Sequence, residues 1–102
     1  MRGRYFVTEK DPRYRRAASA VKRSVAGEVF LVPVTNGVAD VMSLYVLNPT
    51  AEVIWDLLEE PRSLNEICEH IRQVTGEAGA HVREDCCNFL NQLEELGLVE
   101  RA

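Results

Sequence analysis

The sequence predicts an α+β fold in which a three-stranded antiparallel sheet is followed by three helices. Three observations support this prediction. Residues 20–47 contain short runs of β-branched and bulky residues separated by turn signals. An Asn-Pro dipeptide at positions 48 and 49 then marks a change in the spacing of the apolar residues. From there to Leu96 the spacing follows the 3.6-residue period of helices. A chain of 102 residues, 46% of them hydrophobic, suits one small domain.

Three strands are expected before the Asn-Pro dipeptide. Ala20–Val25 ("AVKRSV") alternates apolar and polar residues, as an exposed strand does. A turn leads into Val29–Val34, where Pro33 suits the end or the edge of a strand. Asn36-Gly37 favours a tight hairpin, because both residues tolerate positive φ, and it leads to a third strand over about Asp40–Leu47. Short links between consecutive strands favour an antiparallel meander.

The stretch "LYVLNPTAEVIWDLL", residues 44–58, predicts the corner between the sheet and the first helix. Asn48 suits the cap, because its side-chain carbonyl accepts from free amides of the first turn. Pro49 suits the first helical position, where its missing N–H is not needed. The helix is expected from Pro49 to about Glu59, with Pro61 stopping it. Its apolar face comprises Val53, Ile54, Leu57 and Leu58.

A second helix is expected to begin after Ser63, which forms a capping box with Glu66. Gly76 is expected to end this helix. Its apolar face comprises Leu64, Ile67, Cys68, Ile71 and Val74.

A third helix is expected to begin near His81 and to end at Gly97 in the left-handed conformation. Leu98 and Val99 are expected to fold back as a hydrophobic closure. The predicted inner stripe of this helix is Val82, Cys86, Phe89, Leu93 and Leu96. Three strands followed by three helices, the last two joined by a short turn, give the outline of a winged helix-turn-helix domain.

The charge distribution divides the chain into two parts. Residues 1–25 contain eight Lys or Arg and two acids, a local charge of +6, and the remainder carries −10. We expect residues 1–18 to form a basic arm, extended or poorly ordered, and residues 19–102 to form the domain. The arm is interpreted either as a solvated terminus attracted to the acidic body or as a nucleic-acid contact. Because no apolar run reaches membrane-spanning length and the first residues lack a secretory pattern, we expect a cytoplasmic protein and no membrane partner.

No catalytic or metal-binding constellation is evident in the sequence. The three cysteines, Cys68, Cys86 and Cys87, lack CxxC spacing, so reduced thiols are expected. His70 and His81 have no evident nucleophilic partner, and no glycine-rich phosphate loop occurs. On a helix Cys68 and His70 point about 200° apart, and Cys86 and Cys87 about 100° apart, so one ion could hardly bind all four. We therefore expect neither an enzyme nor a cofactor or metal site.

Three segments resemble the PqqD-like family, named for coenzyme pyrroloquinoline quinone synthesis protein D. They are "GEVFLV", "YVLNPTAEVIWDLLEEPRSLNEIC" and "VREDCCNFLNQLEELGLVE". The resemblance covers about Val21–Glu100. It implies a non-enzymatic role, in which the domain binds the leader segment of a ribosomally made precursor peptide. It also implies presentation of that peptide to a modifying enzyme, often a radical S-adenosylmethionine protein. The leader would be added as a fourth strand beside Val41–Leu47, against the helix Val82–Leu96.

The residues themselves favour peptide binding at this place. The third strand is apolar at both alternating sets of positions, whereas a strand with one face in solvent normally alternates. On the third helix a second stripe lies beside the core stripe, and Leu90 is expected to line the groove there. The candidate peptide-binding residues are Val41, Met42, Ser43, Leu44, Tyr45, Val46 and Leu47 on the strand, and Arg83, Cys87, Leu90, Asn91 and Glu94 on the helix. The alternative is that Leu90 and one strand face merely widen the core.

Two other classes of function stay open from the sequence. A winged-helix DNA-binding protein fits the topology, but the third helix carries one base, Arg83, against Glu84, Asp85, Glu94 and Glu95. This local charge would be repelled by phosphates, so nucleic acid is a disfavoured partner. A structural subunit without a peptide ligand is the third class. An exposed strand edge also makes a homodimer by edge pairing or strand swapping plausible.

Overall fold

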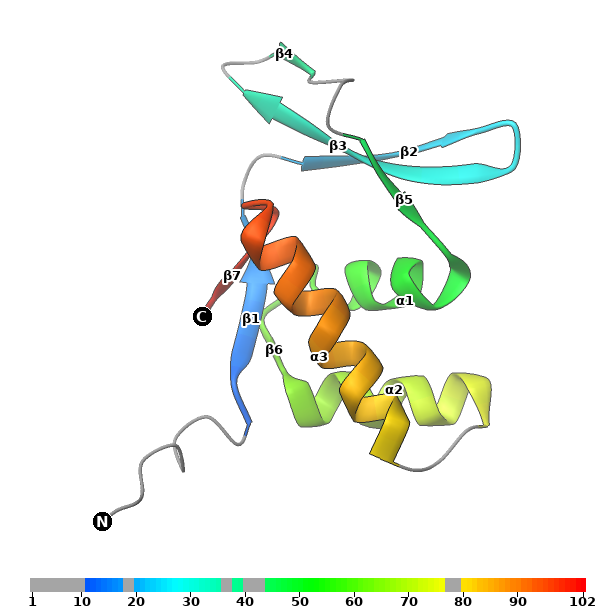
Figure 1. The fold of residues 1–102 in the computed structure, drawn as a ribbon, viewed down its shortest axis with the longest axis vertical. Coiled ribbons are helices and arrows are strands. Elements are labelled where there is room, and N and C mark those ends of the chain that lie inside the picture. Colours follow the sequence, from blue (N-terminus) through cyan, green and yellow to red (C-terminus); the bar gives the residue numbers. More distant parts are fainter. Residues whose placement is uncertain (1–10, 18–19, 36–37, 40–43, 77–79) are drawn as a thin grey trace.

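The computed structural model describes residues 11–17, 20–35, 38–39, 44–76 and 80–102. It shows an α+β fold, as predicted. The described residues form three helices, a four-stranded sheet and a three-stranded sheet. Figure 1 shows the larger sheet at the top of the molecule, the helices below it, and the smaller sheet beside the helices. Among the described residues no helix is both long enough and apolar enough to cross a membrane.

The first sheet has β3 (Glu28–Thr35) at its centre, paired antiparallel with β2 (Ala20–Val25), β4 (Val38–Ala39) and β5 (Tyr45–Leu47). The bounds of β2 are those predicted. The hairpin between β2 and β3 turns at Ala26 and Gly27, whose φ angles are 53° and 83°. The predicted turn at Asn36-Gly37 lies outside the described residues, as does the predicted part of the third strand over residues 40–43.

Local capping signals explain where the first two helices begin. In α1 (Pro49–Leu57), Asn48 caps the helix, and its Oδ1 accepts from the amide of Ala51 at 2.8 Å. In α2 (Leu64–Thr75), the predicted capping box is present. The Glu66 amide donates to Ser63 Oγ at 3.1 Å, and the Ser63 amide donates to Glu66 Oε1 at 2.8 Å.

Glycines in the left-handed conformation follow the second and third helices, as predicted. Gly76 ends α2 with a φ of 76°. The third helix, α3, runs from Ala80 to Glu95 and is followed by Gly97, also with a φ of 76°. The chain then folds back, and Leu98 and Val99 are both buried. The predicted hydrophobic closure is confirmed.

The second sheet was not predicted, and it shows that the expectation for the basic arm, residues 1–18, was partly wrong. Its order is β6 (Arg62–Ser63), β1 (Arg13–Arg16), β7 (Val99–Arg101), and both pairings are antiparallel. Part of the segment predicted to be an extended or poorly ordered arm is therefore a central strand, with Tyr14 only 1% exposed. β1 was not predicted from the sequence, because three of its four residues are arginines.

Two sets of contacts made by basic side chains join the strands to α1. The guanidinium of Arg16 lies over the Trp55 ring, 4.5 Å from its centroid, and donates twice to the Trp55 carbonyl oxygen, at 3.1 Å and 2.7 Å. On β2 the Lys22 ammonium donates to Glu52 and to Asp56, each at 2.9 Å. Both contacts hold basic residues of the N-terminal quarter against the first helix.

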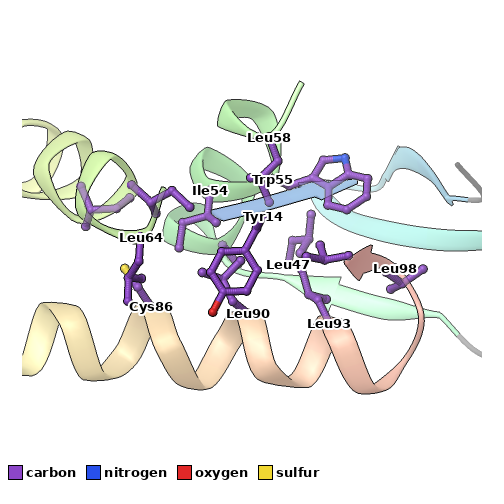
Figure 2. Close-up of a cluster of buried hydrophobic side chains, with 14 of the residues drawn as sticks. Tyr14, Leu47, Ile54, Trp55, Leu58, Leu64, Cys86, Leu90, Leu93 and Leu98 are labelled. Atoms are coloured by element: carbon purple, nitrogen blue, oxygen red, sulfur yellow. The ribbon is translucent and has the colours of Figure 1, made fainter. Parts of the chain in front are cut away.

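The core lies between the first sheet and the helices (Figure 2). On α2 the predicted inward residues are buried except Val74, which is 56% exposed. On α3 the predicted stripe was partly wrong, because Phe89 is half-buried and Leu96 is 54% exposed. The buried residues of α3 are Val82, Cys86, Leu90 and Leu93, so the helix is rotated relative to the prediction. Figure 2 shows Leu90 pointing from α3 into the core.

Candidate functional site

The outer edge of β5 is the most distinctive feature of the first sheet. β5 pairs with β3 through three residue pairs, Tyr45 with Leu31, Val46 with Phe30, and Leu47 with Val29. Within the part of the chain that the structure describes, no other strand pairs with β5. Its second edge therefore presents backbone groups that another extended chain could pair with.

Side chains of this segment alternate between two environments. Leu47 is buried in the core and Tyr45 is half-buried, so these two point toward the helices. Leu44 and Val46 are 44% and 57% exposed and lie on the opposite face. The segment thus offers apolar side chains on both faces, as its composition predicted. Of the predicted strand residues, Val41, Met42 and Ser43 lie outside the described residues.

Helix α3 contacts β5 through Tyr45. The Tyr45 and Phe89 rings lie 5.9 Å apart between centroids, at 58° to each other. The Tyr45 hydroxyl donates to Oε1 of Gln92, one turn further along the helix. Burial raises the pKa of the Tyr45 hydroxyl above its usual value, so this group is a neutral donor at physiological pH. The strand edge and one face of α3 are therefore held together.

A cavity of about 260 Å³ adjoins this contact. It lies where the start of α1, the end of α2 and the first half of α3 meet. Its apolar lining comprises Ala51, Ile54, Ile71, Val82, Cys86 and Phe89, and its polar lining comprises Asn48, Thr50, Thr75 and Asp85. Phe89 lines the cavity and contacts Tyr45, and Asn48, the residue that follows β5, also lines it, so the cavity lies next to β5.

Comparison with protein-family models assigns the chain to a family. The model of the family described as "Coenzyme PQQ synthesis protein D (PqqD)" matches residues 31–99. The chain belongs to the PqqD family. No match was found among curated proteins or among solved structures.

The PqqD match covers the whole candidate site. It begins within β3 and ends in β7, so it includes β5, the three helices and every residue that lines the cavity. Strands β1 and β2 precede the matched range. The resemblance seen in the sequence is thereby confirmed at the level of the family.

The α3 residues that were predicted to bind the peptide lie in different environments. Leu90 is fully buried, so the prediction that it lines an open groove was wrong, and the alternative that it belongs to the core is correct. Cys87 is half-buried against the core. Arg83 donates to Oδ1 of Asn65, and Glu94 pairs with Arg101 at 3.3 Å. Asn91 is exposed.

The α3 residues that contact Tyr45 or line the cavity were not among the predicted site residues. Phe89 was predicted to lie in the core, and neither Gln92 nor Asp85 was predicted to belong to the site. The error has one cause. Residues 89 and 90 are about 100° apart on a helix, and an apolar residue at each makes either one a reasonable centre of the buried stripe.

The cysteine thiols of the PqqD-like chain lie at the interface of α2 and α3. Cys68 and Cys86 are both buried. Burial raises the pKa of the Cys86 thiol to about 12, with further contributions from Cys68, and burial also raises the pKa of Cys68. Among the described residues no group of three or more His, Cys, Asp or Glu side chains could hold a metal ion.

Proposed function

We propose that this PqqD-family protein binds the leader segment of a ribosomally made precursor peptide by strand addition to the outer edge of β5. The observation that carries the proposal is the edge of β5 beside α3, with which no other described strand pairs. An added strand gains backbone hydrogen bonds, while pockets for alternate side chains give specificity.

The alternation of β5 defines what the peptide meets. Side chains on one face of the added strand would lie beside Tyr45 and contact Phe89 and the cavity. Side chains on the other face would lie beside Leu44 and Val46, which are exposed and apolar. The peptide therefore needs apolar residues at alternating positions to use both faces.

The magnitudes suffice for useful affinity. About four to six backbone hydrogen bonds contribute about 0.5–1.5 kcal/mol each. Two or three apolar side chains contribute about 1.5–3 kcal/mol each when buried. Ordering the peptide costs about 2–5 kcal/mol, and association costs more. A net value of about −8 kcal/mol corresponds to micromolar binding.

The bound peptide would be presented to a modifying enzyme, in our proposal a radical S-adenosylmethionine protein of a pathway of the pyrroloquinoline quinone type. In this role the protein is a peptide chaperone in the cytoplasm and not itself an enzyme. The winged helix-turn-helix assignment belongs to the same proposal. The comparisons give no support to the alternative of DNA binding.

The test is a titration of the isotope-labelled protein with the leader of a precursor peptide encoded beside its gene. Backbone amide signals of Tyr45, Val46 and Leu47 and side-chain signals of Phe89 should shift together. Shifts confined to the second sheet or to α2 would overturn the proposal.

Two exposed valines provide a matched pair of variants. Val46 on β5 and Val74 on α2 are 57% and 56% exposed, so Lys at either position leaves the core intact. Val46→Lys should weaken leader binding about tenfold, or about 1.4 kcal/mol, whereas Val74→Lys should leave it unchanged. Equal effects of the two substitutions would contradict binding at β5.

Edge pairing between two copies of the chain is the competing use of the same edge. Sedimentation of the free protein separates the two cases. Leader binding at β5 predicts a complex containing one chain and one peptide, and an edge-paired dimer should dissociate when the peptide is added.

A further inference from the structure

The cavity beside β5 has walls and a mouth of different chemistry. Its apolar walls come from all three helices, and oxygen-bearing side chains of Asn48, Thr50, Thr75 and Asp85 complete the lining. Of the described residues that line it, Asp85 alone is charged. A ligand group that fits must therefore combine an apolar body with a polar or cationic end.

Asp85 is placed to receive such an end. Val82, Asp85, Cys86 and Phe89 follow each other at steps of three, one and three, which places them on one face of α3. Val82 and Cys86 are buried, while Asp85 is exposed at the mouth of the cavity. The described residues include no base that pairs with Asp85, so its carboxylate is available to a ligand.

The volume of the cavity decides between classes of ligand. Sites for small molecules and cofactors usually measure about 300–1,000 Å³. At about 260 Å³ the cavity lies below that range. It suits one or two side chains of a peptide better than a separate small molecule. Asn48, which directly follows β5, and Phe89, which contacts Tyr45, both line the cavity, so a strand added beside β5 would pass close to it.

We propose that the cavity takes a Lys or Arg side chain of the leader peptide, with Asp85 as the specificity-determining residue. This inference rests on the proposed function. The aliphatic stem packs against Val82 and Phe89, and the cationic head reaches the Asp85 carboxylate and the face of the Phe89 ring. An acidic side chain is repelled by Asp85, and a wholly apolar side chain gains no favourable contact with its carboxylate.

The test uses amino-acid probes that cannot form a strand. N-acetyl methylamides of lysine, arginine, norleucine and glutamate are titrated separately while the NMR signals of Val82 and Phe89 are followed. The lysine and arginine probes should bind about fivefold more tightly than norleucine, as a charged contact of about 1 kcal/mol predicts. The glutamate probe should not shift these signals.

Asp85→Asn is the decisive variant, because this exposed side chain can lose its charge without changing the core. In this variant the lysine and arginine probes should bind no more tightly than norleucine. Glu84→Asn removes a neighbouring exposed charge that does not line the cavity, and it should retain the preference. Equal binding of lysine and norleucine to the unmodified protein would overturn the inference.

Failure of this inference is distinguishable from failure of the proposed function. If the leader shifts the amides of β5 but Asp85→Asn does not alter its affinity, strand addition stands and the basic anchor is wrong. If the lysine probe binds at Val82 and Phe89 but no leader shifts β5, the cavity assignment stands and strand addition is wrong.

Discussion

Phe89 and Leu90 are consecutive on α3 but have different partners. Leu90 is fully buried among the helices, and Phe89 is half-buried with its ring 5.9 Å from that of Tyr45. Substitution of Leu90 should therefore affect mainly the stability of the fold, and substitution of Phe89 should affect mainly peptide binding. Leu90→Ala removes buried volume and should lower the free energy of unfolding by about 2–5 kcal/mol. Phe89→Ala should cost less stability but weaken leader binding about tenfold or more.

Urea unfolding and leader titration of both variants check this first prediction. A loss of stability in Phe89→Ala as large as that in Leu90→Ala would place Phe89 in the core instead. A leader affinity unaffected by Phe89→Ala would remove α3 from the binding site.

A second prediction concerns Arg16, which stacks on Trp55 and donates twice to its carbonyl oxygen. Arg16→Ala should lower the free energy of unfolding by about 1–2 kcal/mol. The part-buried Trp55 carbonyl keeps the Leu58 amide as a donor but loses both guanidinium donors, and the Trp55 ring loses the cation stacked on it. Arg16→Lys should recover only part of this, since an ammonium lacks the planar fork. Arg15 is the control. It pairs with Glu100 in solvent, and Arg15→Ala should cost at most about 1 kcal/mol.

A third prediction tests the cap of α1. Asn48 accepts from the amide of Ala51 at 2.8 Å, so Asn48→Ala should destabilise the protein by about 0.5–2 kcal/mol. Asn48→Asp keeps the acceptor and places a negative charge at the helix start, so it should retain stability. Thermal unfolding of the two variants gives the comparison. Equal losses for Ala and Asp would show that the acceptor is not what Asn48 supplies.

The fourth prediction concerns alkaline pH. Folding raises the pKa of Cys86 from 9.0 to about 12, so the native thiol keeps a proton that the unfolded chain releases in this range. The unfolded state binds fewer protons there, and stability therefore falls as pH rises above 9. The raised pKa of Lys22, held by Asp56 and Glu52, adds a loss at pH values above 10.5.

Cys86→Ala isolates the contribution of the thiol. Relative to its own value at pH 7, its stability should fall less between pH 9 and 10.5 than that of the unmodified protein. Unfolding in urea at several pH values provides the measurement. Identical pH profiles for the two proteins would show that Cys86 does not titrate with folding.

Features of the fold that depend on residues close together in the sequence were predicted, and features that depend on distant residues were not. The starts of α1 and α2 and the glycines after α2 and α3 were predicted, because Asn48, Ser63 with Glu66, Gly76 and Gly97 act within one helical turn. β1 was missed, because its stability depends on partners far along the chain and its own composition is mainly arginine.

The candidate site was predicted at the level of its elements and missed at the level of helix rotation. The strand edge followed from the apolar residues around Tyr45, and the facing helix from the family resemblance. Which residues of α3 face the strand depends on how the helix packs, and the sequence offered Phe89 and Leu90 as equal candidates. Packing around Leu90 decided between them.

The position of β1 between β6 and β7 has a consequence for the order in which the chain acquires its structure. Arg15 on β1 and Glu100 on β7 are paired although they are 85 residues apart. During synthesis β1 leaves the ribosome long before β7 has been made. The Tyr14 side chain therefore cannot be fully buried until nearly all of the intervening chain has been synthesised. Such distant contacts slow folding relative to local ones. The second sheet should therefore form after the helices, and its pairing should be the step that completes the domain.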